Sequence, residues 1–132
     1  NLLNIKNAQN LDIVGDIDIL WIKNNTIKYI FEVESTTSMT SALQRGSNVE
    51  KDVPKIMLFP ADRFKQFERK MKTPLFSERF VEDNWKFILF EQLYNAWHNH
   101  KAKLVIEGIA NMEVKQSAKK EANENQMEFE LS

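Results

Sequence analysis

The chain has 132 residues, of which 42% are hydrophobic and 11% aromatic, and its formal net charge at pH 7 is −1. This length and apolar content are typical of one folded domain with a single core, and they exclude a disordered chain. The absence of cysteine excludes a disulfide framework, a thiolate metal site and a cysteine nucleophile. No apolar run approaches the roughly 20 residues of a membrane span and no signal-peptide pattern opens the chain, so we expect a cytoplasmic protein without a membrane partner.

The net charge gives no global sign of a nucleic-acid partner, but an acidic metal site would hide a basic surface in that sum. The chain begins at Asn1 without an initiator methionine, and we therefore expect it to be a piece of a longer protein. Within it we expect a single domain over residues 1–118 and an acidic, mobile tail over residues 119–132.

Alternation of apolar and polar side chains predicts two strands at the start of the chain. Residues 12–22 and residues 26–34 both alternate with the period of two that a strand requires. The Asn24-Asn25 pair between them predicts a turn, because Asn tolerates the left-handed backbone conformation. The two strands are therefore expected to form a hairpin.

The register of this hairpin follows from its charged residues. A loop of two residues would place Asp18 opposite Phe31 and mix charged with aromatic side chains on both faces. A loop of three residues, ending at Thr26, would instead pair Asp18 with Glu32 and Asp16 with Glu34, and we predict this register. One face is then expected to be pure core: Ile17, Ile19, Trp21, Ile27, Tyr29, Phe31 and Val33. The four acids gather at one end of the other face.

The rest of the chain alternates helices and strands. Thr36 or Thr37 can cap a helix that runs to about Val49. Its buried side is expected to consist of Met39, Ala42, Leu43 and Gly46. We then expect, in order, a buried strand at residues 55–59, a helix at 61–72, a strand at 85–90, a helix from 91 to about 99, and a helical segment at 101–114. This order predicts an α/β fold whose mixed sheet, a hairpin plus further strands, is flanked by helices on both faces.

The clustered acids point to a metal ion. Carboxylates within water-excluding strands are costly to desolvate unless a cation pairs with them, and like charges opposite each other destabilise a sheet. Hard cations such as Mg²⁺ prefer oxygen ligands, so Asp18 and Glu32 could share an ion. Glu34 could bind a second ion or orient the attacking water, and the Val33 carbonyl is a further candidate ligand. Asp16 is a weaker candidate. The alternative interpretation is a solvated sheet edge lined by acids.

The spacing of these acids resembles the PD-(D/E)XK nuclease superfamily, which has the restriction-endonuclease-like fold. The signature of that superfamily is an acid at the end of one strand and a D/E-x-K tripeptide on the next strand, followed by a helix. Asp18 matches the first element and Glu32-Val33-Glu34 the second, in an ExE variant where Glu34 replaces the lysine. The stretch from Phe31 to Arg45 also resembles uncharacterised restriction-endonuclease-like proteins with a FEVE-x-TTS signature. The resemblance covers residues 12–60 well and the rest by element order.

The resemblance implies a metal-dependent endonuclease that hydrolyses DNA phosphodiester bonds, with a restriction or DNA-processing role. Asp18, Glu32 and Glu34 would be catalytic, and the cofactor would be Mg²⁺, with Mn²⁺ as a substitute. The partner would be double-stranded DNA, and many enzymes of this fold act as homodimers. Recognition of a DNA sequence could lie in an additional domain outside this fragment.

Polar and basic side chains are candidates for contacts with DNA phosphates. On the helix after Glu34 these are Gln44 and Arg45, and on the 61–72 helix they are Arg63, Lys65, Arg69 and Lys70. Arg45 could instead neutralise the acids, and a basic helix face is more often simply solvated.

Two alternatives to a deoxyribonuclease follow from the same residues. The loss of the lysine favours a catalytically inactive nuclease-fold module that binds nucleic acid or a protein partner. A nuclease that acts on RNA or branched DNA is the second alternative.

Overall fold

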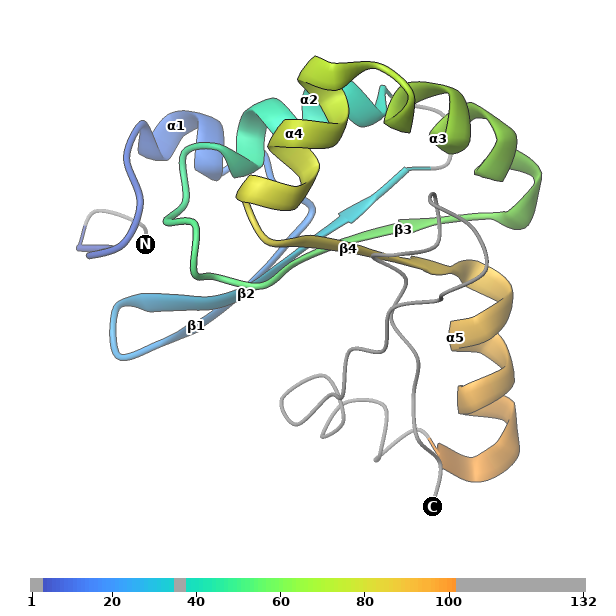
Figure 1. Ribbon diagram of the computed structural model, residues 1–132. Helices are drawn as coiled ribbons and strands as arrows, with labels where there is room; N and C mark the ends of the chain where they lie inside the picture. Colours follow the sequence, from blue (N-terminus) through green and yellow to red (C-terminus); the bar gives the residue numbers. More distant parts are fainter. Residues whose placement is uncertain (1–3, 35–37, 102–132) are drawn as a thin grey trace.

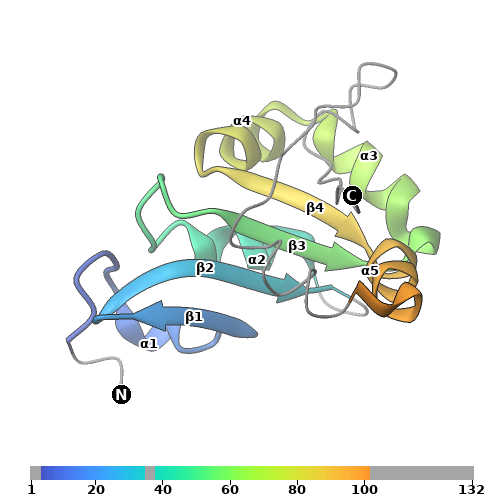
Figure 2. The ribbon, with the colours of Figure 1, turned by 90° about the horizontal axis from the view of Figure 1, so that it is seen from below.

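The computed structural model describes residues 4–34 and 38–101, and every structural statement below concerns these residues. They form one four-stranded sheet in the order β1-β2-β3-β4 (Figure 2). Its strands are β1 (Ile19–Lys23), β2 (Thr26–Val33), β3 (Lys55–Phe59) and β4 (Trp85–Leu89). β1 runs antiparallel to β2, whereas β2, β3 and β4 are parallel to one another. The sheet is therefore mixed, as the sequence predicts.

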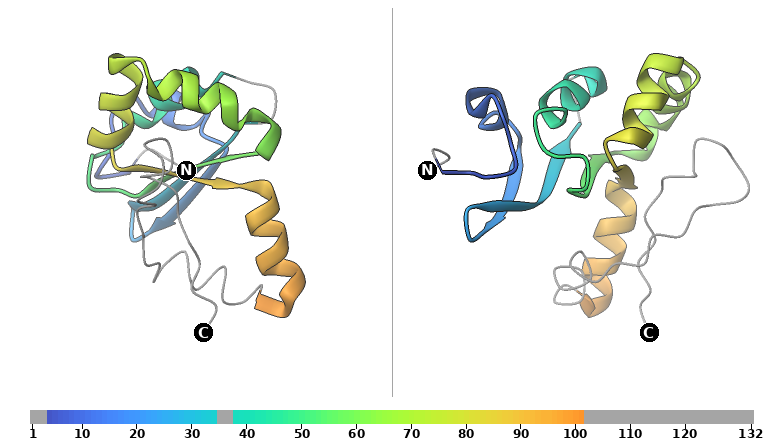
Figure 3. Two further views of the ribbon diagram at one scale, coloured as in Figure 1. Left: turned by 45° about the vertical axis from the view of Figure 1, so that its right-hand side comes forward. Right: turned by 60° about the vertical axis from the view of Figure 1, so that its left-hand side comes forward.

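Helices cover both faces of the sheet (Figure 1). On one face lie α1 (Leu11–Val14), α2 (Met39–Gly46), α3 (Phe64–Met71) and α4 (Pro74–Glu82), with the 3-10 turn Ala61–Arg63 leading into α3. On the other face lies α5 (Phe90–Ala96), which a π-helical turn (Trp97–Lys101) extends away from the sheet (Figure 3). This arrangement confirms the predicted α/β class with helices on both faces.

The turn of the hairpin differs from the prediction, although the register beyond it agrees. Asn24 and Asn25 have φ values of 54° and 59°, and Lys23 pairs with Thr26 across a two-residue loop. The loop is therefore a two-residue turn of the kind that asparagine favours. The register then shifts by one residue between Trp21 and Ile22, which leaves Lys28 as the extra residue of a bulge.

The bulge restores the predicted register at the acidic end, where Ile19 pairs with Phe31. It also overturns the predicted assignment of Ile27, which turns to the face of Ile30 and the larger core cluster instead of the face of Tyr29 and Phe31. Ile19, predicted as core, is 49% exposed because β1 is the edge strand. A bulge adds one residue to a strand, so the side chains on one side of the bulge point to the opposite faces from those that an unbroken alternation predicts.

The start of the chain also differs from the prediction. Residues 12–18 were expected to belong to the first strand, but Leu11–Val14 forms helix α1 and β1 begins only at Ile19. Val14 and Ile17 still bury their side chains in the larger cluster. Alternation of apolar and polar residues alone could not distinguish a short helix from a strand here, because both can present two apolar side chains to one core.

Helix α2 packs as predicted, with Met39, Ala42, Leu43 and Gly46 buried. Gly46 permits a close approach to the sheet, because a Cβ added there would lie 2.5 Å from Cζ2 of Trp85. Helix α4 was not predicted from the sequence. Its signals are Pro74 at the first helical position and the buried pair Phe76 and Phe80, which lie four residues apart on one side of the helix.

Strand β3 is buried along its whole length because it lies between two parallel strands and under helices on both faces. Lys55 begins it, and its ammonium donates hydrogen bonds to the carbonyls of Glu50, Val53 and Asp83 at 2.8, 3.0 and 2.8 Å. Burial lowers the pKa of Lys55 to about 8. This lysine therefore ties the loop before β3 to the loop after α4.

Several expectations fall on residues outside the described ranges. These are the Thr36 or Thr37 cap, the helical segment of 101–114 beyond Lys101, and the tail at 119–132. They stay predictions, as does the limit of the domain at residue 118.

Candidate metal centre

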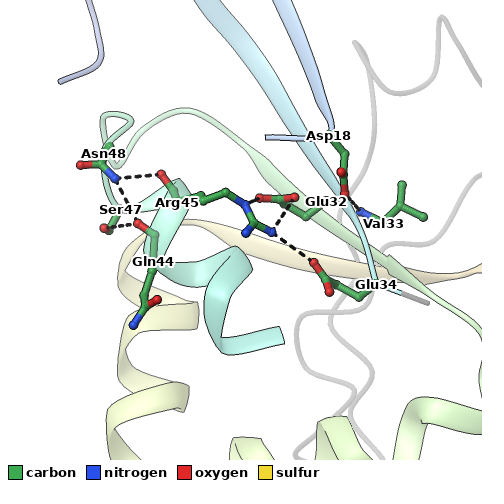
Figure 4. Close-up of polar contacts among 8 residues, drawn as sticks. All are labelled: Asp18, Glu32, Val33, Glu34, Gln44, Arg45, Ser47 and Asn48. Carbon is green, nitrogen blue, oxygen red and sulfur yellow. Dashed lines mark hydrogen bonds and ion pairs between the residues drawn. The ribbon is translucent and has the colours of Figure 1, made fainter. Parts of the chain in front are cut away.

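Three carboxylates converge between the sheet and helix α2 (Figure 4). Asp18 immediately precedes β1, Glu32 lies near the end of β2, and Glu34 directly follows β2. Each offers a carboxylate oxygen, and these oxygens all lie within 4.8 Å of one another. Glu32 and Glu34 are fully buried, whereas Asp18 is exposed. We call these three residues the carboxylate cluster.

The strand geometry explains why these acids meet. Glu32 and Glu34 are two residues apart in an extended segment, so their side chains point to the same face. The bulged register brings Asp18 next to them, and its carboxylate accepts a hydrogen bond from the Val33 N–H at 2.7 Å. The backbone at Glu34 is fixed by β3, because its N–H donates to the Leu58 carbonyl at 2.7 Å.

Asp16 does not join the cluster. Its N–H donates to the Ile13 carbonyl at 3.0 Å, in the turn that follows α1. Asp16 is exposed and is not one of the converging carboxylates. The predicted pairing of Asp16 with Glu34 is therefore wrong. The physical reason is that the ladder begins at Ile19, so the chain has already left the strand direction at Asp16.

Arg45 holds the two buried glutamates from the opposite side. It extends from α2, and its Nε and Nη2 donate to the two carboxylate oxygens of Glu32 at 2.6 and 3.1 Å (Figure 4). Its Nη2 also lies 3.6 Å from Oε1 of Glu34. Such two-pronged contacts are the strongest ion pairs that a guanidinium makes. In this structure the guanidinium of Arg45 therefore faces carboxylates.

Arg45 alone does not balance the charges of the carboxylate cluster. Burial raises the pKa of Glu32 to about 7, against the opposing effect of Arg45, and the neighbouring Asp18 raises it further. The pairing with Glu32 in turn raises the pKa of Arg45. Three carboxylates and one guanidinium leave an excess of negative charge, which either a proton on Glu32 or an additional cation would relieve.

The donor set fits a hard divalent cation. Its ligand atoms are carboxylate oxygens on strand-held residues, and the exposed Asp18 leaves one side open to water. The Val33 carbonyl stays a predicted ligand. The Val33 N–H on the same peptide segment already orients Asp18.

The predicted phosphate contacts occupy two places. Arg63 lies near the cluster, because its Nη1 donates to the Glu34 carbonyl at 3.4 Å, and Gln66 accepts hydrogen bonds from its Nε and Nη2 at 3.2 and 2.9 Å. The others lie on two helices of the same layer, Gln44 on α2 and Lys65, Arg69 and Lys70 on α3. Gln66 and Arg79 were not recognised from the sequence. Arg79 was missed because it lies on helix α4, which was not predicted from the sequence.

The comparisons with known proteins identify the family. A family model described as the type II restriction enzyme NmeDI C-terminal domain matches residues 1–114. The chain belongs to this family. Neither the curated proteins nor the solved structures give a match. The matched range of the NmeDI C-terminal domain family includes all three residues of the carboxylate cluster, as well as Arg45.

Family membership confirms the restriction-enzyme relationship that the sequence predicts. The narrower assignment to the PD-(D/E)XK superfamily and its signature stays a prediction. Within the described part of the chain, no helix has the length and apolar character to cross a membrane.

Proposed function

We propose that this chain is a metal-dependent endonuclease that hydrolyses phosphodiester bonds of double-stranded DNA. The observation that carries the proposal is the convergence of Asp18, Glu32 and Glu34, whose carboxylate oxygens lie within 4.8 Å of one another. Membership of a family named for a restriction-enzyme domain supports DNA as the substrate. Mg²⁺ is the proposed cofactor, with Mn²⁺ as a substitute, because all three side chains offer hard oxygen ligands.

Asp18 and Glu32 are the proposed metal ligands, together with the Val33 carbonyl. A bound Mg²⁺ would lower the pKa of a water molecule and neutralise charge that develops on the phosphate. The protein holds these ligands in place through its backbone, since the Val33 N–H orients Asp18 and β3 fixes the segment at Glu34. Arg45 orients Glu32 and reduces the repulsion between the two glutamates.

Glu34 stands where the resembling nucleases carry lysine. A buried carboxylate carries no positive charge with which to stabilise a phosphate, as a lysine would. We therefore assign Glu34 a role as a metal ligand or as the base that orients water. Some restriction enzymes with this fold carry glutamate at this position. Arg63, in the 3-10 turn that leads into α3, donates from its Nη1 to the Glu34 carbonyl, and we assign it a contact with the phosphate.

Cleavage of supercoiled plasmid DNA tests the proposal. The wild type should nick or linearise the plasmid only when Mg²⁺ or Mn²⁺ is present. Asp18→Ala and Glu34→Ala should lose this activity, and Asp16→Ala serves as the matched control because Asp16 lies outside the cluster. Equal, metal-independent background from all four proteins would refute the nuclease.

Two observations favour the second candidate, a nuclease-fold module that binds DNA or a protein without cleaving it. Arg45 already makes a two-pronged pair with Glu32, and the family model is named for a C-terminal domain of an enzyme. Retained, salt-sensitive DNA binding without cleavage would identify such a module. A homodimer and a separate recognition domain belong to the proposal and are tested by the oligomeric state and by the sequence preference of cleavage.

A further inference from the structure

A cleft of about 690 Å³ opens between helices α2, α3 and α4, apart from the carboxylate cluster. Leu43 and Phe76 are its buried apolar walls. Three cations line it, Arg69 and Lys70 from α3 and Arg79 from α4. Among the described residues that line it there is no aspartate or glutamate. The cleft therefore offers a positive, partly apolar surface for which an anionic ligand is the complement.

Its cations are held in position by neighbouring groups. The Lys70 ammonium donates to Oγ1 of Thr40 on α2 at 2.8 Å and lies 5.7 Å from the centre of the Phe76 ring. Arg79 lies 3.7 Å from the buried carboxylate of Asp83, one helical turn along α4. Arg69 is exposed, and its guanidinium is suited to two-pronged contact with a phosphate.

Helix α3 connects the cleft with the carboxylate cluster. The helical segment begins beside the cluster, where Arg63 donates to the Glu34 carbonyl, and it reaches Arg69 and Lys70 after two turns. At 1.5 Å per residue the distance from Arg63 to Lys70 is about 10 Å. A strand of duplex DNA advances about 3.4 Å per nucleotide along the axis and also winds around it, so its neighbouring phosphates lie further apart than this axial rise. The distance along α3 therefore corresponds to about one or two nucleotides.

We propose that the cleft between α2, α3 and α4 binds the sugar-phosphate backbone of DNA about one or two nucleotides from the phosphate at the carboxylate cluster. The cations contact phosphate oxygens, and the apolar walls accommodate deoxyribose. DNA is favoured over an acidic peptide because a single strand can follow α3 from Arg63 to the cleft. The inference rests on the proposed DNA substrate but not on cleavage.

The first test is binding of a short fluorescein-labelled DNA duplex in EDTA, measured by anisotropy over a series of salt concentrations. Arg69→Gln/Lys70→Gln should bind about tenfold more weakly than wild type, and the slope of log K against log salt should fall by about 2. The matched control is Lys23→Gln/Lys28→Gln, which removes the same charge from exposed residues of the hairpin. Gln44→Glu adds a negative charge to the cleft without removing a cation, and it should weaken binding with an unchanged unfolding temperature.

The second test places the DNA directly. The chain contains no cysteine, so Ser47→Cys in the cleft wall and Lys28→Cys on the hairpin each accept a single photo-crosslinker. The duplex should crosslink to the cleft position and not to the hairpin position.

Equal binding by the cleft and hairpin charge variants, or crosslinking only from the hairpin, would overturn the proposal. Polyglutamate could bind the wild type, lose that binding in Arg69→Gln/Lys70→Gln, and leave duplex binding unaffected. That result would show a protein-docking groove and would also overturn the proposal. Failure of the wild type to bind duplex would refute both the cleft and the DNA substrate. Charge-dependent binding without plasmid cleavage would contradict only the nuclease activity.

Discussion

Arg45 controls the electrostatics of the carboxylate cluster. It is 22% exposed, while the two glutamates it contacts have no exposed surface. A guanidinium and a divalent cation would both stabilise these carboxylates, so they compete for part of the same negative charge. This competition makes the response of the protein to Mg²⁺ depend on Arg45.

Replacing Arg45 with glutamine should lower the free energy of unfolding by about 3 kcal/mol, because two buried carboxylates lose their cation. Mg²⁺ should then raise the unfolding temperature of Arg45→Gln more than that of the wild type. Thermal unfolding with and without Mg²⁺ measures both effects, and Lys23→Gln is the surface control. An equal response of Arg45→Gln and wild type to Mg²⁺ would show that Arg45 and the ion do not share the cluster.

Glu32 should make stability fall as pH rises. Burial raises its pKa from 4.5 to about 7, so between these values the folded chain keeps a proton that the unfolded chain has released. Its contribution is therefore complete below pH 4.5 and is lost by about pH 7, a change on the order of 3 kcal/mol. Glu32→Gln cannot titrate, so the difference between its unfolding free energy and that of wild type should change over this interval. Urea denaturation without metal at several pH values measures it, and a constant difference would contradict the assignment.

At the scale of elements, helix α2 sets the distance between Arg45 and the sheet. The position next to Arg45 is Gly46, where an added Cβ would meet Cζ2 of the buried Trp85 at 2.5 Å and Cδ1 of Ile30 at 3.3 Å. The helix can therefore lie close to β2 only if this residue is glycine.

Gly46→Ala should destabilise the protein by about 1–2 kcal/mol, because overpacking against the ring exceeds the gain of about 1 kcal/mol in helix propensity. The same shift should move Arg45 away from Glu32 and reduce metal-dependent activity. Chemical denaturation measures the first effect, and Gln44→Ala, on the exposed side of α2, is the control. Increased stability of Gly46→Ala would refute the close packing of α2.

The sequence predicted the elements whose pattern of apolar residues was uninterrupted. Helix α2 shows its four buried residues at helical spacing, and β3 is a short apolar run, so both were placed correctly. Helix α1 and the bulge at Lys28 depend on single residues and tertiary contacts, which periodicity does not report. The bulge explains why the predicted register holds where Ile19 pairs with Phe31, next to Asp18 and Glu32, although the predicted loop length was wrong.

The same distinction holds within the site. Asp18, Glu32 and Glu34 could be grouped from the hairpin alone, because they lie on or directly beside its two adjacent strands. The residues of the cleft could not be grouped from the sequence, because Arg69 and Arg79 come from separate helices that meet only after the chain has folded. Helix α4, which carries Arg79, was also not predicted.

At the scale of the whole molecule, the two candidate sites lie on the same side of the sheet, the side that α2, α3 and α4 cover (Figure 1). The carboxylate cluster lies beneath α2 and the cleft lies between α2, α3 and α4. The opposite face is covered by α5 over a smaller apolar cluster. We therefore expect DNA to approach from the side of α2 and α3.

Titration with Mn²⁺, followed by the electron paramagnetic resonance signal of the free ion, tests the central claim most directly. At a pH above the pKa of Glu32, the wild type should bind Mn²⁺ at the carboxylate cluster. Asp18→Asn, which keeps the shape but removes one charged ligand, should bind it at least about tenfold more weakly, and Asp16→Asn should behave as wild type. Equal Mn²⁺ affinity in all three proteins, or no binding by the wild type, would contradict a metal centre at Asp18, Glu32 and Glu34.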